Sequence, residues 1–259
     1  MIASGFFWSC VPVPEENPEP GIPVNSMLVK KIVESEPDGT TFTTEYTYVG
    51  KKISEITESD GKRTEITYEG DLITKEEEFN ATDILLTRTT YVYDISENLV
   101  SYVDVTFDND GDANDDSSGE RWVYVHNANG TISYEEFIGD ATSQTTHYID
   151  GTITTNQYIE NNVDPITMVA QVFTDTFTFD TKHNPYVNVI GYDKIYFAAS
   201  DSPLNFVNNE LSQTDQIDSN AAYLLESTSY TYTANNFPLT ETITDRNGEV
   251  TGTANYTYY

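Results

Sequence analysis

Carboxylate and amide side chains occupy alternate positions in one short acidic segment of the sequence. They are Asp108, Asp110, Asp112, Asn114 and Asp116. Their oxygens are hard ligands, and a tight loop can fold such a series around one cation of the calcium type. These residues are therefore a candidate calcium site, and the sequence indicates no other cofactor. The alternative is a solvated hairpin loop, in which Asp, Asn and Gly are common.

Trp122 is a second candidate, as part of a ligand-binding surface. In the segment 121–125, Trp122 and Tyr124 form one alternating set, and Val123 and Val125 form the other. Both sets are apolar, so this strand is either covered on both sides or presents one apolar face to a partner. Aromatic side chains stack on sugar rings and anchor protein interfaces. We therefore expect Trp122 and Tyr124 to contact a glycan, a peptide or a protein partner; the alternative is burial in the core.

The sequence contains no recognisable catalytic motif. The three histidines, His126, His147 and His183, are far apart, and neither a His-Glu-x-x-His nor a Gly-x-Ser-x-Gly motif is present. With 43 Asp and Glu residues, some carboxylate pair falls at glycosidase spacing by chance. We therefore expect no enzymatic activity, with a polysaccharide hydrolase as the alternative.

Cys10 is the only cysteine, so it forms no disulfide within the chain. An apolar segment and Ser9 precede it, and a Pro/Glu-rich segment follows, which is typical of an extended spacer. This arrangement resembles the lipobox of a bacterial lipoprotein. The resemblance implies a diacylglycerol on Cys10 and a lipid-anchored location at the outer membrane of a bacterial envelope. Because no Lys or Arg precedes Cys10, we expect the true start upstream of Met1; the alternative is a disordered N-terminus with an incidental cysteine.

The charge balance argues against nucleic acid as a partner. The 259 residues include 12 Lys and Arg against 43 Asp and Glu, a net charge of −31, which repels a polyphosphate. No apolar run reaches the roughly 18 residues of a membrane-spanning helix, so membrane attachment is expected through a lipid only. With 37% hydrophobic and 13% aromatic residues, the chain has the composition of a globular protein.

A loose repeat organises the chain from residue 28 to its end. Its units end in alternating aromatic pairs, as at 46–48, 91–93 and 256–258, and turn residues such as Gly50 or 127–130 follow. Eight such anchors with seven return strands predict an antiparallel meander of 15 strands. Only one segment is compatible with a helical turn, at 192–199. We expect three parts: a leader at 1–10, a tether at 11–27 and a single β-repeat domain at 28–259.

The strands alternate in polarity, which predicts one dry and one wet face of the sheet. In the segment 42–49, Phe42, Tyr46 and Tyr48 share one face, while Glu45 and Thr47 lie on the other. Several strands are too short and too rich in flanking Glu to cross a bilayer. We therefore expect an all-β fold, a soluble curved sheet or half-barrel, with a membrane-spanning barrel as the alternative.

Two family resemblances rest on turn and strand motifs. Tyr93-Asp94 and Phe179-Asp180 are similar to the YD repeats of Rhs-type shell proteins. The segments 177–186, 191–194 and 230–239 resemble Bacteroidetes envelope lipoproteins of unknown function that are described as porin-like. In addition, the acidic run 108–116 resembles an EF-hand-type or thrombospondin-type calcium loop. These resemblances imply an envelope β protein and transfer no catalytic residue.

The sequence thus favours a non-catalytic surface or outer-membrane lipoprotein that binds a glycan, a peptide or an envelope protein. Two alternatives remain open. One is a calcium-stabilised, adhesin-like module, and the other is the polysaccharide hydrolase.

Overall fold

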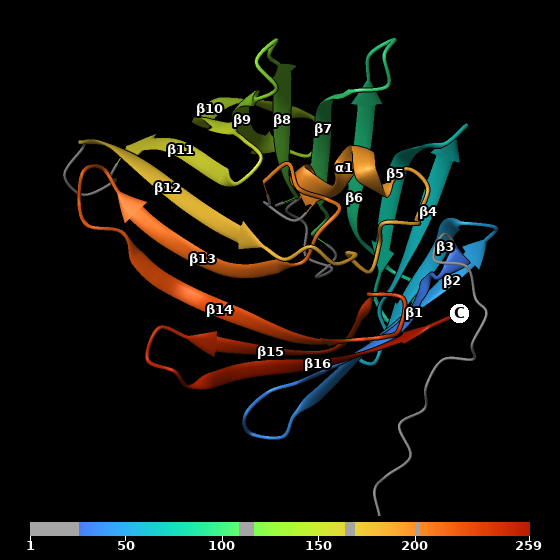
Figure 1. The fold of residues 1–259 in the computed structure, drawn as a ribbon. Helices are drawn as coiled ribbons and strands as arrows, with labels where there is room; N and C mark the ends of the chain where they lie inside the picture. The colour runs from blue at the N-terminus through green and yellow to red at the C-terminus, as the bar shows by residue number, and fades with distance from the viewer. Residues whose placement is uncertain (1–25, 109–116, 164–168, 200–202) are drawn as a thin grey trace, which may run out of the picture.

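The computed structural model describes residues 26–108, 117–163, 169–199 and 203–259, and these form sixteen strands and one helix (Figure 1). The all-β, antiparallel meander expected from the repeat is confirmed, with one strand more than expected. The elements are β1 (Val29–Ser35), β2 (Thr41–Val49), β3 (Lys52–Glu58), β4 (Arg63–Glu69), β5 (Leu72–Phe79), β6 (Leu85–Tyr93), β7 (Leu99–Thr106), β8 (Ser118–His126), β9 (Ile132–Asp140), β10 (Ser143–Ile153), β11 (Gln157–Val163), β12 (Ala170–Phe179), α1 (Tyr192–Ala199), β13 (Glu210–Ile217), β14 (Tyr223–Tyr232), β15 (Pro238–Asp245) and β16 (Val250–Tyr258).

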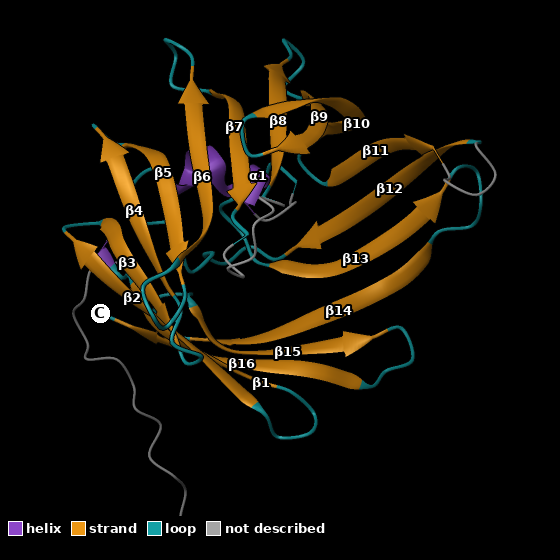
Figure 2. Ribbon diagram, turned by 180° about the vertical axis from the view of Figure 1, so that it is seen from behind, coloured by secondary structure: helices purple, strands orange, loops and turns teal. Residues whose placement is uncertain are grey.

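The sheet is curved, as expected, but it closes on itself, so it forms a complete barrel and not a half-barrel. Every strand pairs with its neighbours in sequence, and β1 pairs with β16 through contacts such as Ile32 opposite Tyr256. This pairing satisfies the backbone groups that an open sheet would expose along both edges. The single ring of strands is visible in Figures 1 and 2.

Hairpin turns of one recurring form set the register between many strands. In the turn after β6, Glu97 N–H donates to the Asp94 carbonyl at 3.0 Å, and Asp94 N–H donates to the Asn98 carbonyl at 2.9 Å. The Asp94 carboxylate also accepts hydrogen bonds from the backbone N–H groups of Ser96 and Asn98, and these bonds lower the pKa of Asp94. The aspartate of the Tyr-Asp pair therefore stabilises the turn that follows the strand.

Aromatic and aliphatic side chains fill one end of the barrel. There the connection between β12 and β13, which contains α1, enters the ring of strands and packs against its inner face (Figure 2). Phe197 of α1 lies edge-on against Tyr124 at 5.1 Å between ring centroids, and the hydroxyls of Tyr186 and Tyr46 are 2.7 Å apart. The helix expected at 192–199 is confirmed. We call residues 180–199 and 203–209 the plug segment.

The outer face of the barrel is largely polar. Glu77 of β5 lies between two cations on this face, at 2.6 Å from Lys75 and 2.7 Å from Arg88. Threonines and serines occupy many of the other outward positions, interrupted by exposed valines such as Val92 and Val125. No helix in the described part of the chain is long and apolar enough to cross a membrane.

A glycine in β10 makes room for an inward-facing aromatic ring. A Cβ atom on Gly151 would lie 2.0 Å from the Ile159 carbonyl oxygen and 2.5 Å from the Tyr134 ring. Tyr134 in turn stacks on Tyr158, with 5.1 Å between ring centroids. A side chain at position 151 must therefore displace both a neighbouring strand and this pair of rings.

Gly151→Ala is expected to lower the free energy of unfolding by about 1–3 kcal/mol, because the added methyl group overpacks the interior. Gly252→Ala in β16 is the matched control, since its Cβ would meet nothing closer than Ile243 Cδ1 at 3.9 Å. The free energy of unfolding of the control should stay the same or rise by up to about 1 kcal/mol, because alanine reduces the entropy of the unfolded chain. Urea denaturation compares the two variants, and equal stabilities would contradict the packing argument.

Candidate functional site

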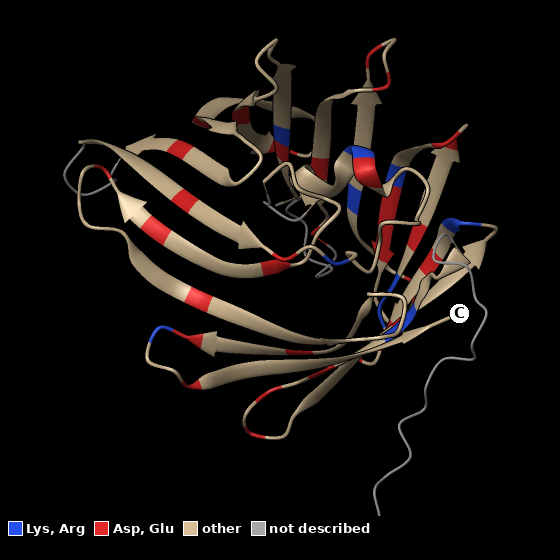
Figure 3. Ribbon diagram, in the orientation of Figure 1, with Lys and Arg blue, Asp and Glu red and all other residues tan. Residues whose placement is uncertain are grey.

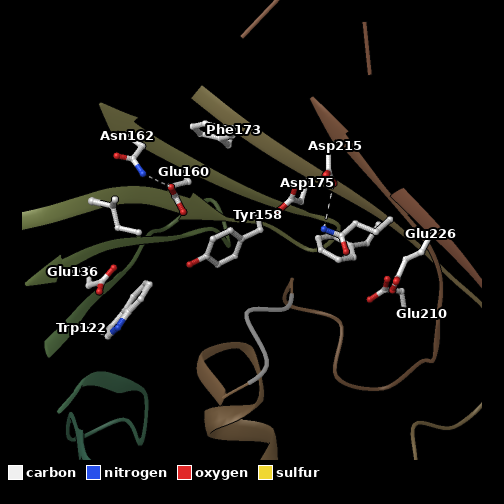
Figure 4. A pocket seen from close by; sticks show the side chains of 13 residues that line it. Trp122, Glu136, Tyr158, Glu160, Asn162, Phe173, Asp175, Glu210, Asp215 and Glu226 are labelled. Carbon is white, nitrogen blue, oxygen red and sulfur yellow. Dashed lines mark hydrogen bonds between the residues drawn. The ribbon is translucent and has the colours of Figure 1, made fainter. Parts of the chain in front are cut away.

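A cavity of about 690 Å³ lies in the lumen against β8–β14 and borders the apolar cluster that packs around the plug segment. Its size is within the usual range for a small-molecule site. The lining side chains, drawn in Figure 4, all point inward from the strands or from their ends. They are Trp122, Glu136, Ile149, Tyr158, Glu160, Asn162, Phe173, Asp175, Phe177, Glu210, Gln213, Asp215 and Glu226.

Strand pairing brings two aspartates together in this cavity. Asp175 of β12 is opposite Asp215 of β13, and Tyr158 of β11 is opposite Asp175 on the other side. Side chains that face each other across antiparallel strands have Cβ atoms about 5 Å apart. Asp175 and Asp215 therefore lie side by side (Figure 4), although the plug segment separates them in the sequence.

The surroundings of the carboxyl groups favour their neutral forms. Burial, together with hydrogen bonding and charge from Asp215, raises the pKa of Asp175 to about 6. Burial also raises the pKa of Glu210 to about 7, with added repulsion from Glu226 and Glu241. Protonation of Asp175 and Glu210 would therefore remove part of the negative charge in the cavity.

No basic side chain compensates this charge. All 12 Lys and Arg residues of the chain lie within the described ranges, and none of them lines the cavity. Strands β9–β16 contain no Lys or Arg. Figure 3 shows the same asymmetry, with the strands of this half of the barrel coloured only red or tan.

Trp122 lines the opposite end of the cavity from Glu210 and Glu226 (Figure 4). Its indole is stacked on Tyr102 and packs against Tyr134, with centroids 6.1 Å and 5.3 Å away. The residue is 9% exposed, so it is less open than the expected platform. Its buried Nε1–H has no hydrogen-bond partner among the described residues.

Tyr124, which was expected to act with Trp122, is outside the cavity lining. It is 4% exposed and packs on Phe197 of the plug segment. The rings of Trp122 and Tyr124 are stacked, with centroids 6.5 Å apart, but only Trp122 lines the cavity. A direct role of Tyr124 in ligand binding stays a prediction.

The predicted calcium and lipid positions fall mainly outside the described ranges. Of the calcium candidates only Asp108 is described, and its backbone N–H donates to Ser117 Oγ at 3.0 Å. Asp110, Asp112, Asn114, Asp116 and Cys10 lie outside those ranges. Within them, no group of three or more His, Cys, Asp or Glu side chains could hold a metal ion. The calcium site stays a prediction.

Sequence reasoning missed the acidic cavity. One available signal was the position of Asp175, which alternates with Phe173 and Phe177 and so shares the aromatic face of its strand. Glu160 follows the same rule two residues after Tyr158. Carboxylates on the dry face of a strand are rare unless they are paired or face a hydrated space. That pattern indicates a polar lumen.

No protein-family model matches this chain, and no curated protein matches it either.

Glu210→Gln is expected to stabilise the protein at pH 8. The pKa of Glu210 is raised from 4.5 to about 7 in the folded state, so folding favours the protonated form. Its contribution is most favourable below pH 4.5 and is lost as the pH rises through 7. The rise in pKa corresponds to about 3 kcal/mol at pH 8, part of which the neutral amide should recover.

Thermal and urea melts between pH 5 and 8 measure this effect. Stability of the variant should depend less on pH than that of the parent protein. Glu45→Gln, on the exposed outer face of β2, is the control and should leave the profile nearly unchanged. A pH profile that Glu210→Gln leaves unaltered would contradict the assignment.

Proposed function

We propose that this protein is a non-catalytic binding module that holds a small ligand, or the end of a larger one, in the lumen cavity. The observation that carries the proposal is the composition of the cavity wall. Trp122, Tyr158, Phe173 and Phe177 provide apolar and stacking surfaces, and carboxylate and amide groups provide hydrogen bonds. Aromatic walls combined with convergent hydrogen-bonding groups are typical of small-molecule sites, and this lining is more polar than most of them.

The proposed setting is the bacterial envelope, with the barrel in water and a lipid on Cys10 as its anchor. The ion pairs of Glu77 with Lys75 and Arg88 support a water-facing wall, because a wall in contact with lipid needs an apolar band. The resemblance to Bacteroidetes envelope lipoproteins supports the same setting.

A polysaccharide hydrolase is the second candidate. The feature in its favour is the adjacent pair Asp175 and Asp215, in which a raised pKa keeps one carboxyl group available as an acid. However, glycosidase carboxylates are about 5 to 9.5 Å apart, to leave room for a sugar or a water molecule. Asp175 and Asp215 interact by hydrogen bonding, which is closer than either mechanism uses. The geometry therefore favours binding.

Ligand binding in the cavity should change the fluorescence of Trp122. The chain has two tryptophans, so Trp8→Phe leaves Trp122 as the only reporter. We expect at least one member of a panel of neutral, anionic and cationic oligosaccharides and short peptides to shift its emission. Phe173→Ala should weaken that binding at least tenfold, because it removes a wall of the cavity.

Val172→Ala is the matched control, since Val172 is the adjacent residue on the outer face and is 39% exposed. Equal effects of the two substitutions, or a panel without any binder, would reject a ligand site in the lumen. Chromatography of the same mixtures detects shortened oligosaccharides, which would favour the hydrolase.

Cys10→Ala should release the full chain from membranes when it is expressed with a bacterial lipoprotein signal. One thioether-linked diacylglycerol would then be the whole anchor. Detergent-phase partitioning of the parent protein and the variant measures the difference. Ser9→Thr, which keeps the cysteine, serves as the control, and equal partitioning of parent and Cys10→Ala would contradict the anchor.

A further inference from the structure

The two ends of the barrel differ in charge, and one of them receives the N-terminal segment. We infer that the end closed by the plug segment, called the plug end below, lies against an anionic lipid surface. The opposite end then points into solution. The inference rests on the lipid-anchored setting proposed above, and it adds the orientation of the barrel and the surface that meets the lipid.

Hydrogen bonds between the plug segment and neighbouring turns define the plug end. Ile190 N–H donates to the Lys51 carbonyl at 3.0 Å, in the turn between β2 and β3. Leu204 N–H donates to the Thr154 carbonyl at 2.8 Å, in the turn between β10 and β11. Connections in an antiparallel meander alternate between its two ends, so the strand order assigns every other turn to one end.

The chain enters the barrel at the plug end. Asn188 of the plug segment donates from Nδ2 to the Met27 carbonyl at 2.9 Å, just before β1 begins. Cys10 is 16 residues before Ser26, and a chain of that length spans at most about 55 Å. A strand of nine residues is about 30 Å long. The tether therefore starts nearest to the plug end, but it is long enough to permit either orientation.

Charge distinguishes the two orientations. The connections at the plug end contain 6 acidic and 3 basic residues, a net charge of −3, whereas those at the opposite end contain 12 acidic and 2 basic residues, a net charge of −10. The plug-end connections are 50–51, 70–71, 94–98, 127–131, 154–156, 180–209 and 233–237, and the opposite ones are 36–40, 59–62, 80–84, 107–117, 141–142, 164–169, 218–222 and 246–249.

Screening by salt makes the facing end decisive. The Debye length at physiological ionic strength is about 8 Å, so an anionic surface acts on the end that faces it and only weakly on the rest of the chain. The total charge of −31 therefore does not prevent contact by the plug end. Contact by the opposite end would bring far more negative charge to the surface, and repulsion would be stronger.

Basic and apolar side chains supply contacts at the plug end. Lys51 and Lys52 lie in and directly after the turn between β2 and β3, and Lys52 also neutralises Asp71 at 2.9 Å. Val49 is 73% exposed, and Ile95 is fully exposed in its turn. Anionic headgroups attract lysines, and the lipid interface accepts aliphatic side chains. Apolar side chains are exposed at both ends of the barrel, so charge and not hydrophobicity selects the plug end.

The plug segment would then lie between the lipid and the lumen. Its aromatic packing against the inner wall fills that end of the barrel. A ligand for the cavity would therefore enter from the opposite end, which faces solution.

Energy transfer from tryptophan to labelled lipid headgroups tests the orientation. The full chain with Trp8→Phe is coupled through Cys10, its single thiol, to a maleimide-bearing lipid. The vesicles contain phosphatidylcholine, anionic phosphatidylglycerol and a trace of dansyl-phosphatidylethanolamine. Ile95→Trp places a reporter in a plug-end turn, and Ala221→Trp is its counterpart in an exposed turn at the opposite end. The chain without either reporter gives the contribution of Trp122.

We expect energy transfer from position 95 to exceed that from position 221 at least twofold. Vesicles of phosphatidylcholine alone should reduce this difference, because the repulsion that disfavours the opposite end is then absent. This comparison requires no further substitution, so it is independent of how the charge variants fold.

Charge reversal tests the cause of the orientation. Lys51→Glu with Lys52→Glu should lower the transfer from position 95 at least twofold, because it removes basic side chains from the contact surface. Lys62→Glu with Arg246→Glu, in turns of the opposite end, is the matched control and should leave that transfer unchanged. Circular dichroism verifies the fold of each variant.

Equal transfer from the two positions, or greater transfer from position 221, would overturn the orientation. A difference that neutral vesicles and the Lys51→Glu, Lys52→Glu variant leave unchanged would overturn the anionic surface as its cause. Since Cys10 is coupled chemically, neither result depends on its acylation in the cell. The detergent-phase partitioning described above tests that acylation separately.

Discussion

The width of the lumen is the constraint on which the rest of the structure depends. A barrel of about eight strands is filled by its own side chains, whereas one of about sixteen encloses more space than they can fill. This wall is a single layer, so every second residue of each strand points into that space. The chain meets the constraint in two ways. At one end it folds the plug segment against an aromatic lining, and further along it leaves a cavity lined by polar groups.

The division of the lumen explains why so acidic a chain can keep carboxylates inside. Near the plug segment, inward positions such as Ile53, Ile73 and Leu99 are almost completely buried. Toward the cavity, equivalent positions carry Glu160, Asp175 and Asp215. Hydration or a ligand in the cavity lowers the cost of ionising these groups, while their mutual repulsion and partial burial raise the pKa of Asp175. The open space of the cavity thus lowers the cost of keeping neighbouring carboxyl groups inside the barrel.

Local features of the fold could be predicted from the sequence, and long-range features could not. Alternation in segments such as 42–49 identified strands, and Asx and glycine residues identified turns, because both depend on neighbouring residues. Closure was missed because β1 contains two lysines and no aromatic anchor, so nothing local marks it as the partner of β16. The cavity was missed because Asp175 and Asp215 are brought together by the pairing of β12 with β13, two strands that the plug segment separates in the sequence. Trp122 was identified, but its environment depends on Tyr102 and Tyr134 from two other strands, as well as on Tyr124 of its own strand.

The order of strands also has a kinetic consequence. Fifteen of the sixteen strand pairings join consecutive strands, so most of the wall can form hairpin by hairpin with little loop-closure entropy. Only the seam between β1 and β16 joins the two ends of the domain. Formation of that seam requires nearly the whole sheet to have acquired its curvature, so it is the step with the greatest sequence separation. Until it forms, two edge strands are open to pairing with another chain, and the period of exposure to aggregation ends with this final contact.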